Sequence, residues 1–461
     1  MAGDGMILPS ESRVDPDAPA LIAAEGDLTH GALRRKVDGI LNIFPDQKSL
    51  ILIQIENSLA SVLAYVAALE AGHAVLPVDP SLAPDRVEQL VAAYAPEVIL
   101  NAASEDPKTW MKTSSSPADR APLHEDLSLL LLTSGSTGSP KAVRLSRAAV
   151  AANCRGIVSA LAIAPTSRAA GHLPLSYSYG LSVLHSHLQA GAAVVLAPGG
   201  LLDRAFWPLM ARAAVDTFPG VPYHYAMLNR LNLDRLGVPA LRHFTQAGGA
   251  MATADLRRWA GIAAARGGSF TVMYGQTEAA PRMTVLDPAE ADDHPGSVGK
   301  PLPGGSIAIV DARGAPVPVG ETGEVLYRGP NVMMGRAASR ADLAHGDSQG
   351  GVLATGDLGH LDAEGFLFLT GRKGNFVKIC GLRVNLQAVE DAAGAHGAVA
   401  ARQSGDHLIL WTEAPGDDTR QAMKVAVAAE TGLPAAFIQC RFCAALPRHS
   451  NGKLNRAGLP L

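Results

Sequence analysis

The residues most suited to phosphate chemistry form a loop of glycines and hydroxylated side chains that ends in a lysine. An apolar stretch, Leu130-Leu-Leu, runs into Thr133-Ser-Gly-Ser-Thr-Gly-Ser-Pro-Lys141. Glycines let backbone N–H groups approach phosphate oxygens, hydroxyls add donors, and the lysine adds a mobile positive charge. No Gly-Lys-Ser/Thr follows the first glycine at the spacing of a Walker loop. The alternative is a flexible linker, but the preceding strand and the Pro-Lys ending favour a phosphate-binding loop.

Two further candidates are ambiguous when each is considered alone. Asp357 lies in Thr-Gly-Asp-Leu-Gly, a sequence typical of a turn. Lys453 follows Gly452 on a polar segment near the C-terminus, where a lysine is ordinarily a solvated surface residue. Their interpretation therefore depends on whether other motifs accompany the phosphate loop in a fixed order.

Such motifs are present, and together the chain resembles the acyl-adenylate-forming enzymes, a superfamily of acyl-CoA synthetases, peptide-synthetase adenylation domains and beetle luciferases. The phosphate loop looks like that family's signature. In family order, the other matching segments are residues 28–33, residues 69–80, Gln246-Ala-Gly-Gly-Ala250, Tyr274-Gly-Gln-Thr-Glu278, residues 323–330, Thr355-Gly-Asp357, Gly371-Arg372, Lys378-Ile-Cys-Gly381-Leu-Arg383 and residues 447–456. The resemblance covers nearly the whole chain, and chance agreement of so many ordered motifs is negligible.

The resemblance assigns a role in ATP handling to a specific set of residues. Those implied to bind ATP or AMP are Thr133, Ser134, Gly135, Ser136, Thr137, Gly138, Tyr274, Gly275, Gln276, Asp357 and Arg372. Those implied to be catalytic are Lys141, Thr277, Glu278 and Lys453. Tyr274 would offer its ring to adenine, and Asp357 would accept hydrogen bonds from the ribose hydroxyls beside Arg372. Thr277 would donate to the α-phosphate, and Glu278 would be the protein ligand of Mg²⁺.

Lys453 would act in the resembling family's adenylating arrangement. It would reach the substrate carboxylate and the α-phosphate and would steady charge there without acting as a base. Residues 1–372 are predicted to form the AMP-binding domain and residues 373–461 a mobile lid. At the expected hinge, Gly374 replaces the Asp or Lys usual in the family. After rotation of the lid, Gly381 would leave room for a pantetheine thiol.

The acyl pocket is predicted less sharply. The matching segments imply that it is lined by Tyr177, Ser178, Ala247, Gly248, Gly249 and Ala250. Ser178 stands where amino-acid-activating domains carry an Asp that pairs with the substrate ammonium group, so an α-amino acid is disfavoured. Tyr177 is expected at the gate of the pocket. Tyr179 could line the pocket or belong to the core, and His172, His185 and His187 are assigned no chemistry.

Composition excludes several other classes of protein. The 461 residues include 39 Lys and Arg against 43 Asp and Glu, a net charge of −4, which lacks the positive excess of a nucleic-acid or anionic-membrane binder. With 48% hydrophobic and 18% charged residues, the chain is folded rather than disordered. Its start resembles no signal peptide, and the apolar residues 58–77 are interrupted by Glu70 and His73. A cytoplasmic protein without membrane insertion is expected.

The predicted fold class is α/β. Continuous apolar strands at residues 50–55, 129–133 and 193–196 alternate with helical patterns at 58–70 and 84–94, as in helix-covered parallel sheets. From residue 306 to 370 short alternating strands predict a small antiparallel β subdomain, with a hairpin turn at 362–365. Strands at 376–379, 382–384, 408–412 and 437–442, with helices at 386–392 and 419–431, predict a final α+β unit.

These observations predict an enzyme that converts a carboxylic acid and ATP into acyl-AMP and pyrophosphate, then transfers the acyl group to a pantetheine thiol. An acid–thiol ligase using CoA is favoured. The alternatives are a stand-alone adenylation enzyme loading an acyl or amino acid onto a carrier protein, and a degenerate homologue that binds nucleotide without turnover. No appended carrier domain is recognisable, so the thiol is expected from outside. ATP, Mg²⁺ and CoA or phosphopantetheine are the implied cofactors, and the identity of the acid is left open.

Overall fold

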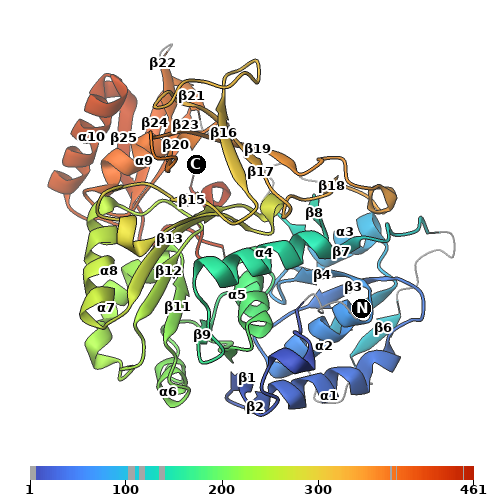
Figure 1. Ribbon diagram of the computed structural model, residues 1–461. Helices are drawn as coiled ribbons and strands as arrows, with labels where there is room; N and C mark the ends of the chain where they lie inside the picture. The colour runs from blue at the N-terminus through green and yellow to red at the C-terminus, as the bar shows by residue number, and fades with distance from the viewer. Residues whose placement is uncertain are drawn as a thin grey trace.

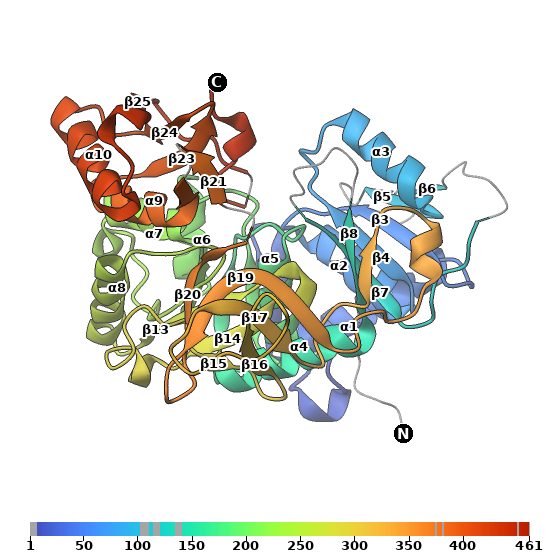
Figure 2. The same cartoon turned by 90° about the horizontal axis from the view of Figure 1, so that it is seen from above.

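The computed structural model describes residues 7–101, 110–113, 120–133, 141–373, 376–379, 382–449 and 451–460. Two large β-sheets lie on either side of a layer of helices, and smaller sheets lie at one end of this pair (Figure 1). Seen from above, the C-terminal segment lies over the helices of the second sheet, away from the N-terminal part (Figure 2). The architecture is the mixed α/β fold with a separate antiparallel sheet that the sequence predicts.

The first large sheet consists, in spatial order, of β18 (Gly335–Ala337), β8 (Ala142–Ser146), β7 (Leu127–Leu132), β4 (Ala74–Val78), β3 (Leu50–Gln54), β5 (Val98–Asn101) and β6 (Met111–Thr113). The strands β7, β4, β3 and β5 run parallel, as their continuous apolar sequences predict. The other three are antiparallel to their neighbours, and β18 comes from a distant part of the chain. The sheet is therefore mixed rather than purely parallel.

The second large sheet consists of β15 (Lys300–Pro301), β14 (Arg282–Leu286), β13 (Ser269–Gly275), β12 (His243–Gln246), β11 (Thr217–Gly220), β9 (Arg168–Gly171), β10 (Ala193–Leu196), β1 (Pro19–Ala23) and β2 (Gly26–Thr29). The strands from β13 to β1 are parallel. The carboxyl ends of β9, β11, β12 and β13 consequently share one edge, which is where open α/β sheets bind ligands. The predicted acyl-pocket residues and the motif Tyr274–Glu278 lie at or after the ends of β9, β12 and β13.

The helices cover both sheets, and several of them begin at side-chain caps. They are α1 (His30–Ile40), α2 (Leu59–Glu70), α3 (Pro84–Tyr94), α4 (Arg147–Ala160), α5 (Ser178–Gln189), α6 (Phe206–Arg212), α7 (Pro222–Leu231) and α8 (Thr253–Ala265). The hydroxyls of Thr29, Ser58 and Ser146 accept N-terminal backbone hydrogens of α1, α2 and α4. Most residues of α2 and nearly every residue of α5 are buried, because a single apolar cluster joins the two helices to strands of both sheets.

An antiparallel sheet follows, made of β16 (Ser306–Val310), β17 (Gly323–Arg328), β19 (Val352–Leu361) and β20 (Leu367–Arg372). This confirms the predicted antiparallel subdomain, including the turn between β19 and β20. The register of the last pair sets Asp357 opposite Arg372. The sheet thereby brings two predicted ribose-binding residues together.

The C-terminal segment forms β21 (Phe376–Ile379), β22 (Leu382–Asn385), α9 (Leu386–Gly394), β23 (Val399–Ser404), β24 (His407–Thr412), α10 (Asp417–Thr431) and β25 (Ile438–Phe442). All of these except β23 are anticipated from the sequence. The segment has its own apolar cluster, which includes Ile379, Val389, Leu410 and Met423. The boundary predicted at residues 372 and 373 remains a prediction.

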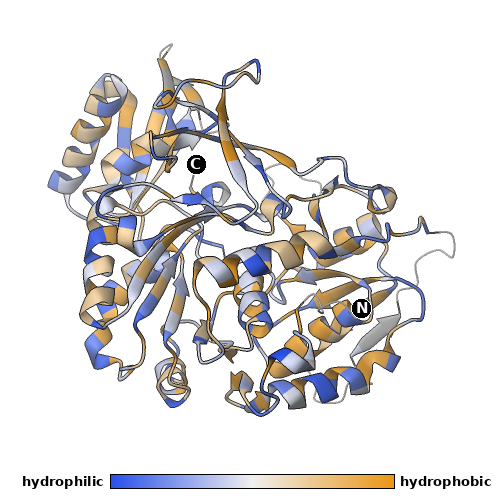
Figure 3. Ribbon diagram, in the orientation of Figure 1, coloured by the Kyte–Doolittle hydropathy of each residue, from blue (hydrophilic) through white to orange (hydrophobic). Residues whose placement is uncertain are grey.

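Hydrophobic residues concentrate in the strands of the sheets, whereas the outer helices carry mixed surfaces (Figure 3). Across the described ranges, no helix combines the length and apolar character needed to cross a membrane.

Candidate active site

One side of the candidate site is built where β13 meets β19. Tyr274, near the end of β13, donates a hydrogen bond from its hydroxyl to Asp357 Oδ2 at 2.5 Å. Arg372 Nε lies 3.4 Å from the other carboxylate oxygen. Burial raises the pKa of Asp357, and the Tyr274 hydroxyl and Arg372 act in the opposite direction. The three residues predicted to hold adenosine are therefore brought together by three different strands.

The short 3₁₀ turn Thr277–Ala279 carries the predicted phosphate and metal residues. Ser178 Oγ and Thr277 Oγ1 are 3.1 Å apart and share a hydrogen bond. The Glu278 carboxylate is 7% exposed and accepts a hydrogen bond from Arg336 Nη2 at 2.9 Å. Because Arg336 lies on β18, which pairs with β8, the strand after the phosphate loop also helps to fix Glu278.

The ends of the phosphate loop lie side by side. Leu132 on β7 pairs with Ala142 on β8, so Thr133 and Lys141 leave adjacent positions in an antiparallel pair. Thr133 donates its backbone N–H to the carbonyl of Lys141 at 3.5 Å. Lys141 is exposed. The loop residues Ser134, Gly135, Ser136, Thr137 and Gly138 lie outside the described residues, as does Gly381.

Lys453 projects from the C-terminal segment onto the acyl side of the site. Its Nζ lies 5.2 Å from the centroid of the Tyr177 ring. A Cβ on Gly248 would lie 3.6 Å from Lys453 Cε. Lys453 keeps contact with solvent, but the protein around its side chain and the nearby Arg372 lower its pKa, while the carboxylates of Glu278 and Asp357 raise it. Lys453 is thus close enough to Glu278 and Asp357 for both carboxylates to interact electrostatically with its ammonium group.

Contacts with α7 accompany this placement of Lys453. Arg448 lies over the ring of Tyr223, with its guanidinium carbon 4.6 Å from the centroid. A Cβ on Gly452 would come 3.0 Å from Val221, so the backbone at Gly452 packs closely against the start of α7. Gly452 also has a φ of +77°, a conformation in which glycine is favoured. The loop before Lys453 is therefore shaped to approach this helix.

The predicted acyl-pocket residues gather at the carboxyl edge of the second sheet. Ala247 is buried in one apolar cluster with Val221 and Met273, against which Tyr177 packs. The Gln246 side-chain amide donates to the carbonyl of Gly249 at 2.8 Å and holds that turn. Burial raises the pKa of Tyr177 to about 12, so its hydroxyl is neutral.

Tyr179, for which the sequence allows two roles, belongs mainly to the core. Its side chain is 2% exposed, and its hydroxyl lies 2.9 Å from the carbonyl oxygen of Thr245 and 2.9 Å from Thr245 Oγ1. Burial also lowers the pKa of His185 to about 3 and that of His187 to about 4 on the same helix. Both histidines are neutral side chains packed inside the protein.

The space next to Gly248 is narrow, so adding a side chain there tests whether Gly248 belongs to the pocket. A Cβ there would lie 2.6 Å from the Tyr177 hydroxyl, and φ is +83°. We expect Gly248→Val to lower acid-dependent ATP–pyrophosphate exchange at least about 10-fold, because the side chain overlaps the gate and strains the backbone. Gly261→Val is the control for the added side chain, since a Cβ there meets nothing within 4 Å. Equal exchange rates for the two variants would contradict the assignment of Gly248 to the pocket.

Two arginines near the candidate site, Arg336 and Arg282, belong to none of the recognised motifs. Arg336 is the partner of Glu278, and its role is set by the pairing of β18 with β8, which no local pattern indicates. Arg282 begins β14 and is 2% exposed. A charged residue at the start of the apolar run Met-Thr-Val-Leu is a signal that could have directed attention to it.

The described residues do not form a metal cage by themselves. Among them no group of three or more His, Cys, Asp or Glu side chains could hold a metal ion. Mg²⁺, however, commonly binds one or two carboxylates and completes its shell with water and substrate phosphates. A single buried carboxylate at Glu278, close to the predicted phosphate position, fits that mode of binding.

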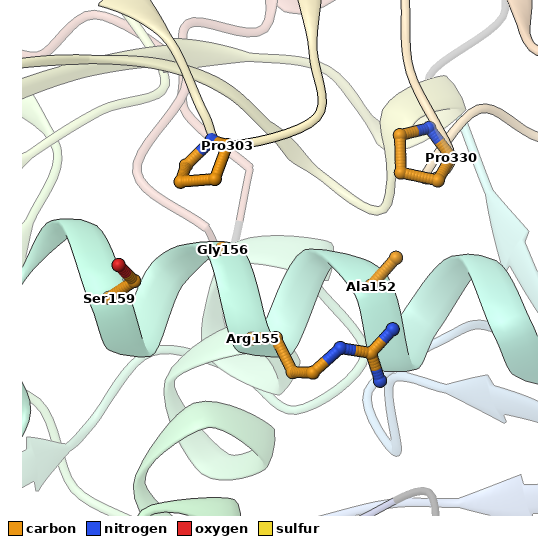
Figure 4. A pocket seen from close by; sticks show the side chains of 6 residues that line it. All are labelled: Ala152, Arg155, Gly156, Ser159, Pro303 and Pro330. Atoms are coloured by element: carbon orange, nitrogen blue, oxygen red, sulfur yellow. The ribbon is translucent and has the colours of Figure 1, made fainter.

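A separate pocket on the surface has few polar groups that could bind or react with a ligand. It lies between α4 and the loops at Pro303 and Pro330 and is lined by Ala152, Arg155, Gly156, Ser159 and the two prolines (Figure 4). Arg155 points away from the prolines in this view, so polar groups do not converge there. The pocket carries no functional assignment.

Comparison with known proteins defines the class. The AMP-binding enzyme family matches residues 9–335, and the chain belongs to this family of adenylate-forming enzymes. Chondramide synthase cmdD of Chondromyces crocatus is 29% identical over 88% of this chain and 11% of its own length. Oxalate–CoA ligase of Arabidopsis thaliana is 33% identical over 41% of this chain and 37% of its own length. The chain thus spans well under two thirds of these relatives, one a synthase and the other a CoA ligase.

Solved structures agree with the fold. ATP-bound MatB from Rhodopseudomonas palustris has a TM-score of 0.78 at 23% identity, over 96% of this chain and 95% of that chain. MenE from Bacillus subtilis, in complex with the acyl-adenylate intermediate OSB-AMP, has a TM-score of 0.78 at 22% identity, over 99% of this chain and 98% of that chain. The described fold is therefore that of adenylate-forming enzymes along nearly the whole chain.

Proposed function

We propose that this protein activates a carboxylic acid with ATP and then transfers the acyl group to a pantetheine thiol. In the first step a carboxylate oxygen attacks the α-phosphorus, a new O–P bond forms, and the bond to pyrophosphate breaks. In the second step the thiol sulfur attacks the acyl carbon, AMP leaves, and the thiol proton is lost. The observation that carries the proposal is the approach of Lys453 to Tyr177 and Gly248, within the electrostatic reach of Glu278 and Asp357.

The positions of the side chains support separate roles in the first step, one set binding adenosine and another stabilising charge at the α-phosphate. The ring of Tyr274 and the carboxylate of Asp357 bind adenosine, with Arg372 beside them. Thr277 donates to the α-phosphate, and Lys453 stabilises the charge that develops between that phosphate and the acid. Holding the substrate carboxylate and the α-phosphate of ATP in a reactive orientation lowers the entropic cost of bringing them together.

Further residues serve the leaving pyrophosphate. The loop at residues 133–141, with Lys141, binds the β- and γ-phosphates in this proposal. Glu278 would hold Mg²⁺, which supplies positive charge to the triphosphate when bound. Arg336 keeps the Glu278 carboxylate in place and neutralises it inside the protein.

The requirement for Mg²⁺ tests the assignment of Glu278. We expect Glu278→Gln to lower ATP–pyrophosphate exchange about 10²-fold and to raise the Mg²⁺ concentration at half-maximal rate, because the amide keeps the shape but not the charge. Titration of Mg²⁺ at fixed ATP measures both effects. Glu430→Gln, on the exposed face of α10, is the control. An unchanged Mg²⁺ dependence in the Glu278 variant would remove Glu278 from the metal site.

The acceptor thiol is proposed to be CoA, with a carrier-protein arm as the alternative. The CoA ligase among the relatives supports the first, and a similarity to CymA of Salinispora arenicola, a probable nonribosomal peptide synthetase that is 28% identical over 64% of this chain and 4% of its own length, supports the second. In either case residues 373–461 would rotate so that Gly381 faces the thiol. A Gly381→Leu variant should then lose thioester formation and keep adenylation.

One experiment tests the whole proposal. Pyrophosphate release is measured with short, medium-length, aryl and amino acids, each with and without CoA. We expect acid-dependent release with at least one non-amino acid and stimulation of that rate by CoA. Release without stimulation by CoA favours a carrier protein. No ATP–pyrophosphate exchange with any acid would overturn the proposal and favour a protein that binds nucleotide without turnover.

A further inference from the structure

The acyl side of the site contains a buried positive charge that adenylation itself does not use. Arg282 lies at the start of β14 and is 2% exposed. Its Nη1 donates to Ser182 Oγ at 2.7 Å, and its Nε donates to the sulfur of Met273 at 3.2 Å. Its guanidinium carbon lies 4.1 Å from the centroid of the Tyr179 ring. None of these neighbours carries a negative charge.

No compensating carboxylate is close to this guanidinium. Among the described residues, none of the Asp and Glu side chains comes within 4.0 Å of it. The groups that influence its charge are the hydroxyls of Tyr177 and Tyr179, which are neutral because burial raises the pKa of each to about 12. A guanidinium stays protonated in proteins, so this charge is buried without a counter-ion.

A second buried arginine, Arg144, has different hydrogen-bond partners from those of Arg282. Arg144 is also 2% exposed, but its two terminal nitrogens donate to backbone carbonyls of Met334, His345 and Gly346. It thereby ties β8 to the segments before and after β18, while its Nε has no partner among the described residues. Arg282 instead meets one hydroxyl, one thioether and an aromatic face. A thioether is a weak acceptor, and within the described part of the chain the guanidinium of Arg282 donates to no carbonyl or carboxylate oxygen.

The position of Arg282 relates it to the acyl pocket. Met273 and Tyr179, which contact the guanidinium, share an apolar cluster with Ala247 and Val221 of the predicted pocket. The rings of Tyr179 and Tyr177 meet edge to face with centroids 6.2 Å apart. Lys453 lies over the ring of Tyr177. Tyr177 and Tyr179 thus lie between two cations. Lys453 is next to Tyr177, and the buried Arg282 is next to Tyr179.

We propose that Arg282 recognises a second anionic group on the substrate, so that the acid activated here is a dicarboxylic acid or a similar dianion. One carboxylate reacts beside Lys453, and the distal carboxylate pairs with the Arg282 guanidinium. The inference rests on the proposed function, because it names the substrate class of the same site. A planar guanidinium suits a carboxylate, with which it can form two parallel hydrogen bonds. An acid without the distal charge leaves the guanidinium unpaired and is rejected.

Matched acids provide the test. ATP–pyrophosphate exchange is measured with succinate against butyrate, glutarate against valerate, adipate against hexanoate, and terephthalate against p-toluate. We expect the wild-type protein to prefer the dicarboxylate of at least one pair by about 10²-fold in kcat/KM. Preference for the monocarboxylate in every pair would overturn the inference and leave the proposed function standing. Exchange with none of the acids would overturn both.

Substitution of Arg282 separates recognition from folding. Arg282→Met preserves length and removes the charge, and we expect it to abolish the preference, mainly through a higher KM for the dicarboxylate, while exchange with the matched monocarboxylate is maintained or increased. Arg282→Lys should retain part of the preference. Arg155→Met, an exposed arginine of α4, is the control. If Arg282→Met fails to fold, as judged by its melting temperature, the wild-type preference and the Arg282→Lys variant decide. An unchanged preference in either folded Arg282 variant would overturn the inference.

Discussion

Replacing Lys453 with alanine should lower acyl-adenylate formation by about 10²- to 10³-fold and leave thioester formation from supplied acyl-adenylate largely intact. The Lys453 side chain lies over the Tyr177 ring and beside Gly248 while it interacts with the charges of Glu278 and Asp357. In the proposed reaction it is the cation that the C-terminal segment brings to the place where the acid and the α-phosphate meet. Two separate assays measure the effect, ATP–pyrophosphate exchange and transfer of a supplied acyl-adenylate to the thiol.

Controls distinguish charge from structure. Lys453→Arg keeps the charge but changes its geometry, and it should recover only part of the exchange activity. Lys424→Ala removes a lysine from α10, a helix that packs against α9 and β25 rather than the site, and it should behave as wild type. Equal loss of both half-reactions in Lys453→Ala would show that Lys453 does not act specifically in adenylation.

The pH dependence follows from the environment of Lys453. Desolvation by the surrounding protein and Arg372 lower its pKa, although Lys453 keeps contact with solvent, so the ammonium group loses its proton at a lower pH than a lysine in free solution does. Adenylation should therefore fall on the alkaline side as the pH rises through this lowered pKa. The Lys453→Arg variant should extend the active range upward, because the guanidinium stays charged.

Much of this site follows from the sequence because its residues occupy short motifs at strand ends. Tyr274 and Thr277 follow one another at the end of β13, and parallel strands place their carboxyl ends at one edge. The order of the motifs then indicates that Asp357 and Lys453 belong with them, although each resembles an ordinary turn or surface residue. The structure places Tyr274 beside Asp357 and brings Lys453 within electrostatic reach of Asp357.

The rest could not be predicted because it depends on pairings between distant segments. β18 joins the first sheet beside β8, nearly two hundred residues away, and only this pairing directs Arg336 to Glu278. Arg282 shows a different limit. Its residue type is visible in the sequence, but a strand end can face solvent or the interior, and only packing against Tyr179 and Met273 reveals a buried charge.

Asp357→Asn is expected to produce the second large loss, about 10²-fold in kcat/KM for ATP. The carboxylate can accept from two ribose hydroxyls at once, whereas an amide offers one accepting oxygen and a donor that is mismatched to a hydroxyl hydrogen. The Tyr274 hydroxyl, which donates to Asp357 Oδ2 at 2.5 Å, can still donate to the amide oxygen, so the fold should be retained. Asp255→Asn, in the first turn of α8, is the control. An unchanged KM for ATP in Asp357→Asn would remove Asp357 from the ribose site.

The raised pKa of Asp357 makes activity and stability respond to pH in opposite directions. Because burial raises its pKa in the folded protein above that of the unfolded chain, the folded state binds the proton more tightly. Its contribution to stability is complete below the unfolded pKa and is lost as the pH rises through the folded pKa. Ribose binding requires the ionised form, so exchange activity should fall as the pH drops through that same raised value. Asp357→Asn should remove both dependences together, and thermal melting and exchange rates measured across one pH series test whether a single carboxyl group controls them.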